Sequence, residues 1–193
     1  MFPGGGHPAG FPTTAGFAPV TNSYGSGTGA TETVPTGATS VTIRVVGGGG
    51  SGAKDSSGVG VPGGGGSGAY GTQTIAVVGG NTFTYTVGAG GVAVASDPAD
   101  GFNGGNSTVS GTVSGGSVAI TAGKGFKGRV LDGMDGEGGT CTGATTDIPG
   151  NPGVFGAGGA SVYGGYGAGG RNQNSYWGSS TAGGAGRVIF EYT

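Results

Sequence analysis

Short runs in which hydrophobic and polar residues alternate are the clearest pattern along this chain. Within residues 40–46 the alternating set is Val41, Ile43 and Val45, and residues 82–87 alternate in the same way with aromatic side chains. Because side chains on a β-strand point in turn to its two faces, this pattern predicts strands with one buried face. The same criteria predict strands at residues 31–34, 40–46, 69–78, 82–87, 107–113, 117–121 and 187–192.

Turn-forming residues separate these runs. Residues 79–81 are Gly-Gly-Asn, and the pair Gly115-Gly116 lies between two strand-like runs, as in a short hairpin. No segment shows a convincing helical period, and frequent glycine opposes helix formation. We therefore expect an all-β fold in which short strands form an antiparallel β-sandwich.

Glycine fills 55 of the 193 positions and collects in three excursions between the strands, at residues 47–68, 88–105 and 123–186. An unstructured loop of the last length is improbable in a compact domain. Glycines recur at every third position in parts of it, and three residues per turn is the period of the polyproline II helix. Two interpretations stay open: side-by-side polyglycine II helices that hydrogen-bond to their neighbours, or a chance spacing at this glycine density.

The first 25 residues differ from the rest, which form one glycine-rich β domain at residues 26–193. Phe2, Phe11 and Phe17 are interspersed with prolines, which favour an extended backbone. We expect this arm to dock on a partner surface through its phenylalanines, and the alternative is a flexible tail.

Composition narrows the classes of partner. The net charge is −2 and only 8% of residues are charged, so no basic face for nucleic acid and no polybasic run for a membrane surface is expected. No apolar stretch is long enough to span a membrane. The beginning of the sequence does not resemble a signal peptide, and a single cysteine permits no internal disulfide. These features predict folding in a reducing cytoplasm.

The inventory of reactive groups argues against an enzyme. His7 is the only histidine and lies in the arm, while Cys141 is the only cysteine and has no evident partner base. No phosphate-binding loop is present, and we expect no cofactor. Asp132, Asp135 and Glu137 form a dense acidic cluster that is a weak candidate for a calcium site; a hydrated turn is the simpler interpretation.

Aromatic and polar side chains in the last excursion are the best candidates for binding. Aromatic faces can cover sugar rings or anchor a protein interface, and amide and guanidinium groups add directional hydrogen bonds. Packing of these rings on flat glycine surfaces is the competing interpretation. The candidate set is Tyr163, Tyr166, Arg171, Asn172, Gln173, Asn174, Tyr176 and Trp177.

Three segments resemble the glycine-rich domain of bacteriophage tail fibres and related appendages. Residues 32–50 resemble its opening pattern, VPxGxTSVTIxVxGGGGGG, and residues 68–91 resemble the segment that follows. There, residues 79–82 read Gly-Gly-Asn-Thr in place of the commoner Pro-Gly-Gln. Residues 183–192 resemble the closing GGxGxVxxEY, so that the likeness covers about residues 30–193.

The resemblance implies a non-enzymatic virion protein, exposed on a tail or head surface, that contributes to host attachment through a surface glycan or protein. The arm would then join it to other virion proteins, and assembly into a homo-oligomer is left open. A head fibre or decoration protein and a bacterial glycine-rich surface or matrix protein are the alternatives.

Overall fold

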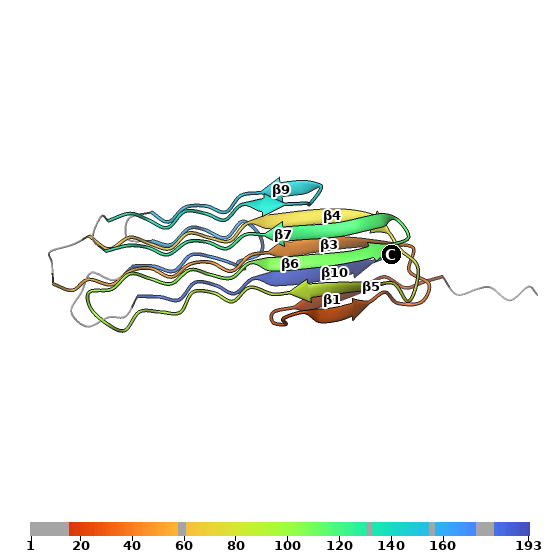
Figure 1. Cartoon of the computed structure of the whole chain (residues 1–193), viewed down its shortest axis with the longest axis horizontal. Coiled ribbons are helices and arrows are strands. Elements are labelled where there is room, and N and C mark those ends of the chain that lie inside the picture. The colour runs from red at the N-terminus through yellow and green to blue at the C-terminus, as the bar shows by residue number, and fades with distance from the viewer. Residues whose placement is uncertain (1–15, 58–60, 131–132, 155–156, 173–179) are drawn as a thin grey trace, which may run out of the picture.

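The computed structural model describes residues 16–57, 61–130, 133–154, 157–172 and 180–193. The described chain is all-β and contains no α-helix, as the sequence predicts. Its strands gather in one half of an elongated molecule, and the glycine-rich segments run side by side in the other half (Figure 1). We call these two halves the sandwich and the bundle.

The sandwich consists of two antiparallel sheets with five strands each, and it is not closed into a barrel. The first sheet has the order β1 (Val20–Tyr24), β10 (Arg187–Tyr192), β3 (Ser40–Val46), β4 (Tyr70–Ala76) and β9 (Thr146–Ile148). The second sheet has the order β2 (Ala30–Thr33), β5 (Thr82–Thr86), β6 (Ser107–Val113), β7 (Gly116–Ala122) and β8 (Cys141–Thr142).

One hydrophobic core fills the space between the sheets. Val41, Ile43 and Val45 of β3 are fully buried, as their alternation predicts. The rings of Phe83 and Phe190, from opposite sheets, lie 5.5 Å apart between centroids. The alternating hydrophobic residues of the sequence therefore supply this core.

Three strands were not predicted. Strand β1 pairs with the last strand of the chain, whereas β8 and β9 are short strands within the third excursion. Because β1 spans Val20–Tyr24, the sandwich includes the end of the range 1–25 assigned to the arm. The predicted hairpin at Gly115-Gly116 is present. It joins β6 to β7, and Val113 and Gly116 are the first pair of residues after the turn.

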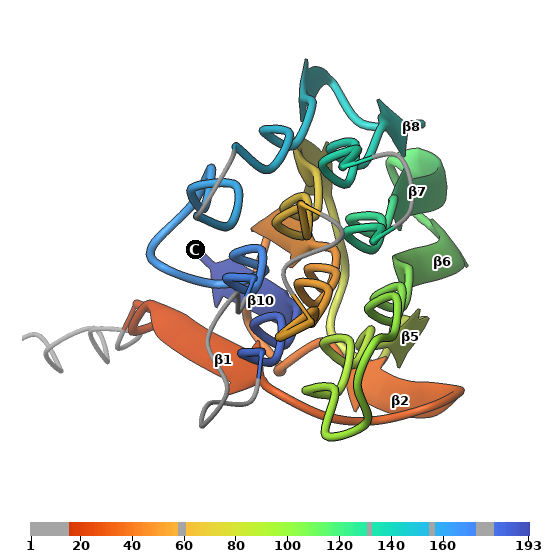
Figure 2. The ribbon, with the colours of Figure 1, turned by 90° about the vertical axis from the view of Figure 1, so that its left-hand side faces the viewer.

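The bundle is built from backbone hydrogen bonds between segments. Gly47, Gly48 and Gly49 donate to Ala69, Gly105 and Gly184, which belong to different neighbours, and Gly50 donates again to the first of these neighbours, at Gly66. Hydrogen bonds that turn to a new neighbour at each residue and return after three residues define a three-fold helix without internal hydrogen bonds. The segments are therefore packed polyglycine II helices, and Figure 2 shows them end-on as tight coils.

Two segments, residues 47–53 and 62–69, form the centre of the bundle and are buried along their whole length. The first donates to three neighbours, within residues 62–69, 102–105 and 180–186, and accepts from three others, so six segments surround it. This explains why its residues are glycine, serine or alanine. A Cβ atom on Gly50 would lie 2.1 Å from the Phe126 carbonyl oxygen, closer than atoms can approach.

Outer segments need glycine where they face the centre or a neighbouring segment, and they can carry side chains where they face outward. Along residues 123–130, Gly125 and Gly128 are buried while Phe126 is exposed, and Gly136 and Gly139 repeat this three-residue pattern in the returning segment. The positions between the glycines carry side chains outward. The bundle therefore presents side chains in rows on its wall, at a spacing of about 9 Å for every three residues.

Candidate functional site

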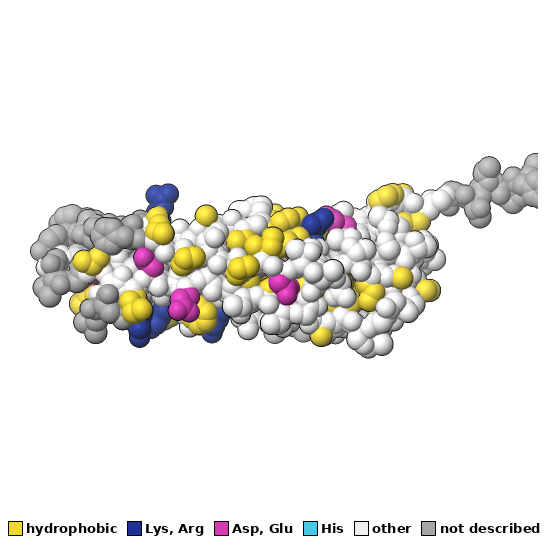
Figure 3. Space-filling model, turned by 90° about the horizontal axis from the view of Figure 1, so that it is seen from above, with side chains coloured by type: hydrophobic (Ala, Val, Ile, Leu, Met, Phe, Trp, Pro, Cys, Tyr) yellow, Lys and Arg dark blue, Asp and Glu magenta, His cyan; other side chains and the backbone are white. Residues whose placement is uncertain are grey.

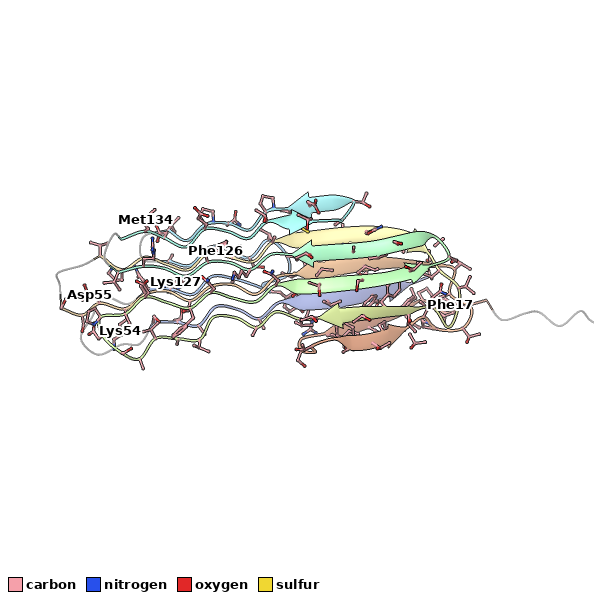
Figure 4. The ribbon with its side chains drawn as sticks, viewed as in Figure 1. Phe17, Lys54, Asp55, Phe126, Lys127 and Met134 are labelled. Carbon is pink, nitrogen blue, oxygen red and sulfur yellow. The ribbon has the colours of Figure 1, made fainter. Side chains whose placement is uncertain are left out.

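The two ends of the molecule differ in chemistry. Phe17 packs against the core at the sandwich end, where Thr193 also accepts backbone hydrogen bonds from Thr39 and Ser40. Lys54 and Asp55 lie at the opposite end, where the segments of the bundle turn back (Figure 4). We call this end the tip. Phe17, which leads into the arm, is thus separated from the turns of the tip by the length of the molecule.

Side chains tie the loops of the tip to one another. The Lys54 ammonium donates to the Ala95 carbonyl oxygen at 3.0 Å, and the Ser56 amide donates to Oδ1 of Asp97 at 2.9 Å. The Val94 amide donates to the buried Ser180 hydroxyl oxygen at 2.8 Å. These contacts join loops that are far apart in sequence, so the tip presents them as one surface.

The predicted receptor-binding residues are divided between two places. Tyr163 and Tyr166 lie where the bundle meets the sandwich, and Tyr163 stacks on Tyr70 of β4 with ring centroids 4.7 Å apart. The Arg187 guanidinium lies over the Tyr166 ring at 5.0 Å, and Arg44 lies over the Tyr163 ring at 5.8 Å. These two tyrosines therefore pack against the outer face of the first sheet.

Arg171 and Asn172 belong instead to the tip. The Arg171 amide donates to Oγ1 of Thr181 at 2.5 Å, and the Asn172 amide group donates to the Pro62 carbonyl oxygen. The remaining candidates lie outside the described residues, between Asn172 and Ser180: Gln173, Asn174, Tyr176 and Trp177. The residues that the sequence analysis predicted to form one site are therefore separated in the fold.

The acidic cluster is dispersed in its described part. Oδ1 of Asp135 accepts a hydrogen bond from the Gly64 amide at 2.7 Å, which ties an outer segment to the centre of the bundle. Glu137 is exposed, and Asp132 lies outside the described residues. Across the described ranges, no group of three or more His, Cys, Asp and Glu residues is placed to hold a metal ion.

Cys141 has the environment of a packed thiol. Burial, together with a hydrogen bond to the nearby Asp147 carboxylate, raises the pKa of Cys141 to about 12. A thiol with this pKa is protonated near neutral pH and is a poor nucleophile. His7, Phe2 and Phe11 lie outside the described residues.

The wall of the bundle carries a feature that the sequence did not predict. Two shallow hollows of about 250 Å³ each border Phe126, one on the Lys127 side and one on the Lys124 side. Phe126 is 40% exposed, and the Lys124 ammonium lies 5.7 Å from its ring centroid. Figure 3 shows charged and hydrophobic side chains interspersed over the part of the bundle in view.

Comparison with known families gives one result. A family model described as a glycine-rich domain matches residues 21–192, which is almost the whole chain. No curated protein matches the sequence. In the part of the chain that the structure describes, no helix has the length and apolar character needed to cross a membrane.

Proposed function

Because the chain belongs to the glycine-rich domain family, and because its segments resemble those of phage appendages, we propose that it is a non-enzymatic virion surface protein of a bacteriophage. It acts as a component of a tail fibre or another appendage and contributes to host attachment. Its arm joins it to other virion proteins, and the tip faces the host.

The separation of arm and tip carries this proposal. Phe17 leads from the arm into the sandwich, whereas the turns that bear exposed side chains lie at the far end of the bundle (Figure 4). The bundle between them is cross-linked by backbone hydrogen bonds in every direction across its axis. Such an arrangement suits a stiff spacer that holds binding loops away from an anchoring surface.

Repetition on the particle supplies the strength of attachment in this proposal. A virion carries an appendage protein in several copies, so weak contacts made by each tip act together. A modest contact surface at one tip is then sufficient for firm binding of the particle.

A structural decoration protein is the second candidate. It is favoured by the packing of Tyr163 and Tyr166 against the sandwich, since these aromatic side chains already have partners within the chain. In that role the protein would be anchored in the same way, but its tip would make no contact that matters for infection.

Substitution of two pairs of aromatic residues distinguishes the candidates. We expect Tyr176→Ala with Trp177→Ala to reduce attachment of particles to their host cells by about tenfold or more, as loss of interface anchors does. The control is Tyr163→Ala with Tyr166→Ala, which should lower thermal stability and leave attachment of the folded protein unchanged. Attachment that survives the first pair, with normal particle assembly, favours the decoration protein.

A further inference from the structure

The two hollows beside Phe126 are neighbours on the wall of the bundle. They share Phe126 as a lining residue, so its ring stands between them along residues 123–130. Figure 4 places Phe126, Lys127 and Met134 along the bundle, away from Phe17 at the opposite end of the molecule. We call these two hollows and the ring between them the wall groove.

Polar groups repeat along the wall groove with the period of the helix. Oδ1 of Asn106 accepts from the Lys124 amide at 2.9 Å, and Oδ1 of Asn103 accepts from the Lys127 amide at 3.0 Å. Each hollow therefore has one asparagine and one lysine. The two asparagines are three residues apart in the sequence, as are the two lysines, and three residues span about 9 Å along the axis. This repeat is close to the length of two sugar rings in an extended chain.

The hydrogen bonds also fix the direction of the asparagine side chains. Because each Oδ1 atom accepts from a backbone amide, the amide NH2 group of each side chain is directed away from that bond. Both asparagines are exposed, so their NH2 groups are presented to an outside acceptor. Glu137, also exposed and lining the first hollow, offers an acceptor for a ligand hydroxyl.

The charges around the wall groove are mixed. Lys127 pairs with Asp100 at 2.9 Å. Arg129 lines the first hollow together with Asp135 and Glu137, and Lys124 lines the second hollow. A nucleic acid needs a positive groove, which these carboxylates oppose. Donors and acceptors at close spacing around an exposed ring instead match a polyhydroxylated ligand, whose hydroxyls both give and receive hydrogen bonds.

We infer that the wall groove binds an extended oligosaccharide, with one sugar ring packed on Phe126 and its neighbours in the two hollows. The inference rests on the proposed attachment function, for which it names a ligand class and adds a second contact surface on the wall, beside the contacts of the tip. The apolar face of a sugar ring covers the exposed part of the Phe126 ring. Lys124 and the asparagine NH2 groups donate to the ring hydroxyls.

The test uses the full-length chain on an array of oligosaccharides from bacterial surface polysaccharides, long enough to span both hollows. The strongest binder is then titrated by calorimetry against three variants. We expect Phe126→Ala to weaken binding by about tenfold or more, and Lys124→Ala to weaken it by about threefold. Phe126 lies outside the hydrophobic core, so its substitution leaves the fold intact.

Phe102→Ala is the matched control. Phe102 is 52% exposed on the bundle and lines neither hollow, so its loss should change the affinity by less than about twofold. An array without a binder, or a titration in which Phe126→Ala and Phe102→Ala behave alike, overturns the inference.

The attachment assay separates this outcome from the proposed function. If the wall groove binds no sugar while particles that carry the protein still attach to host cells, the wall groove alone is excluded. If the chain binds no sugar and particles that carry it attach no better than particles that lack it, both the wall groove and the attachment function are overturned.

Discussion

The Tyr192 hydroxyl donates a hydrogen bond to Oε1 of Glu32 at 2.9 Å and thereby joins the two sheets inside the sandwich. Glu32 is only 4% exposed, and it also accepts hydrogen bonds from the Asn22 amide and the Tyr24 hydroxyl. These donors belong to β1 and β10, whereas Glu32 belongs to β2. One buried carboxylate therefore connects the first strand, the last strand and the opposite sheet.

Replacement of Glu32 tests the weight of this connection. We expect Glu32→Ala to lower the free energy of unfolding by about 3 kcal/mol, because it leaves the buried Tyr192 hydroxyl and two partly buried donors without their acceptor. Glu191→Ala is the control, since Glu191 pairs with Arg44 at a partly exposed site, where an ion pair contributes about 1 kcal/mol or less. Chemical denaturation measures both values, and equal losses would contradict the role of Glu32.

The same cluster predicts loss of stability at alkaline pH. The hydrogen bond to Glu32, together with burial, raises the pKa of Tyr24 to about 12 from its usual value of 10.0. A group whose pKa is higher in the folded chain stabilises the fold while it is protonated. This stabilisation is complete below the unfolded value near 10 and disappears as the pH rises through about 12.

Burial also raises the pKa of Tyr192, so the two tyrosines act in the same direction. Urea unfolding between pH 8 and pH 12 measures the effect. The Tyr24→Phe variant lacks one ionisable hydroxyl, and we expect its stability to fall less steeply with pH than that of the wild type. Parallel pH profiles for the two proteins would show that Tyr24 does not contribute.

Substitution of two glycines in the bundle, with Gly16 beside Phe17 as a control outside the bundle, should have graded effects. A Cβ atom on Gly50 would lie 2.1 Å from a backbone oxygen, on Gly105 it would lie 3.1 Å from the nearest atom, and on Gly16 it would meet nothing within 4 Å. We expect Gly50→Ala to cost about 3 kcal/mol or more, or to prevent folding. Gly105→Ala should cost less, and Gly16→Ala about 0.5 kcal/mol at most.

Thermal unfolding and soluble yield measure this series. If the three alanine variants had similar stability, close packing of main chain on main chain would not hold the bundle together.

The arm gives a prediction about assembly. Deletion of residues 1–15 should leave the domain folded, because Phe17 packs against the core and β1 begins at Val20. The truncated chain should fail to enter particles if the arm is the anchor. Circular dichroism checks folding and quantitative immunoblotting of purified particles checks incorporation; normal incorporation would exclude the anchoring role.

Much of the sandwich could be predicted from sequence because its strands bury one face. Residues 40–46 show this as strict alternation, and the fully buried Val41, Ile43 and Val45 confirm it. Strand β1 was missed because one of its inward positions is Asn22, a polar residue that bonds to Glu32. No local pattern shows that a distant carboxylate will satisfy this side chain.

The bundle could be predicted only in part, and the candidate site less well. Glycine spacing indicates a three-residue period, but the order of neighbours depends on which strands connect to which segments. Tyr163 and Tyr166 are near Arg171 in the sequence, which is why they were predicted to form one site. In the structure the two tyrosines lie where the bundle meets the sandwich, and the segment that follows them runs to the tip, where Arg171 lies. The exposure of Phe126 was not predicted, because it depends on which glycines of its segment face the centre of the bundle. The structure buries Gly125 and Gly128 there, which leaves Phe126 exposed.

The most direct test of the account is immunogold electron microscopy of purified particles with two antibodies. One recognises the exposed loop of the tip at residues 95–98, which Lys54 contacts, and the other recognises residues 1–15 of the arm. We predict gold from the tip antibody at the ends of tail fibres or other appendages on intact particles, and gold from the arm antibody only after the particles are disrupted. Intact particles that bind the arm antibody, or that bind neither, would contradict a virion appendage anchored by its arm.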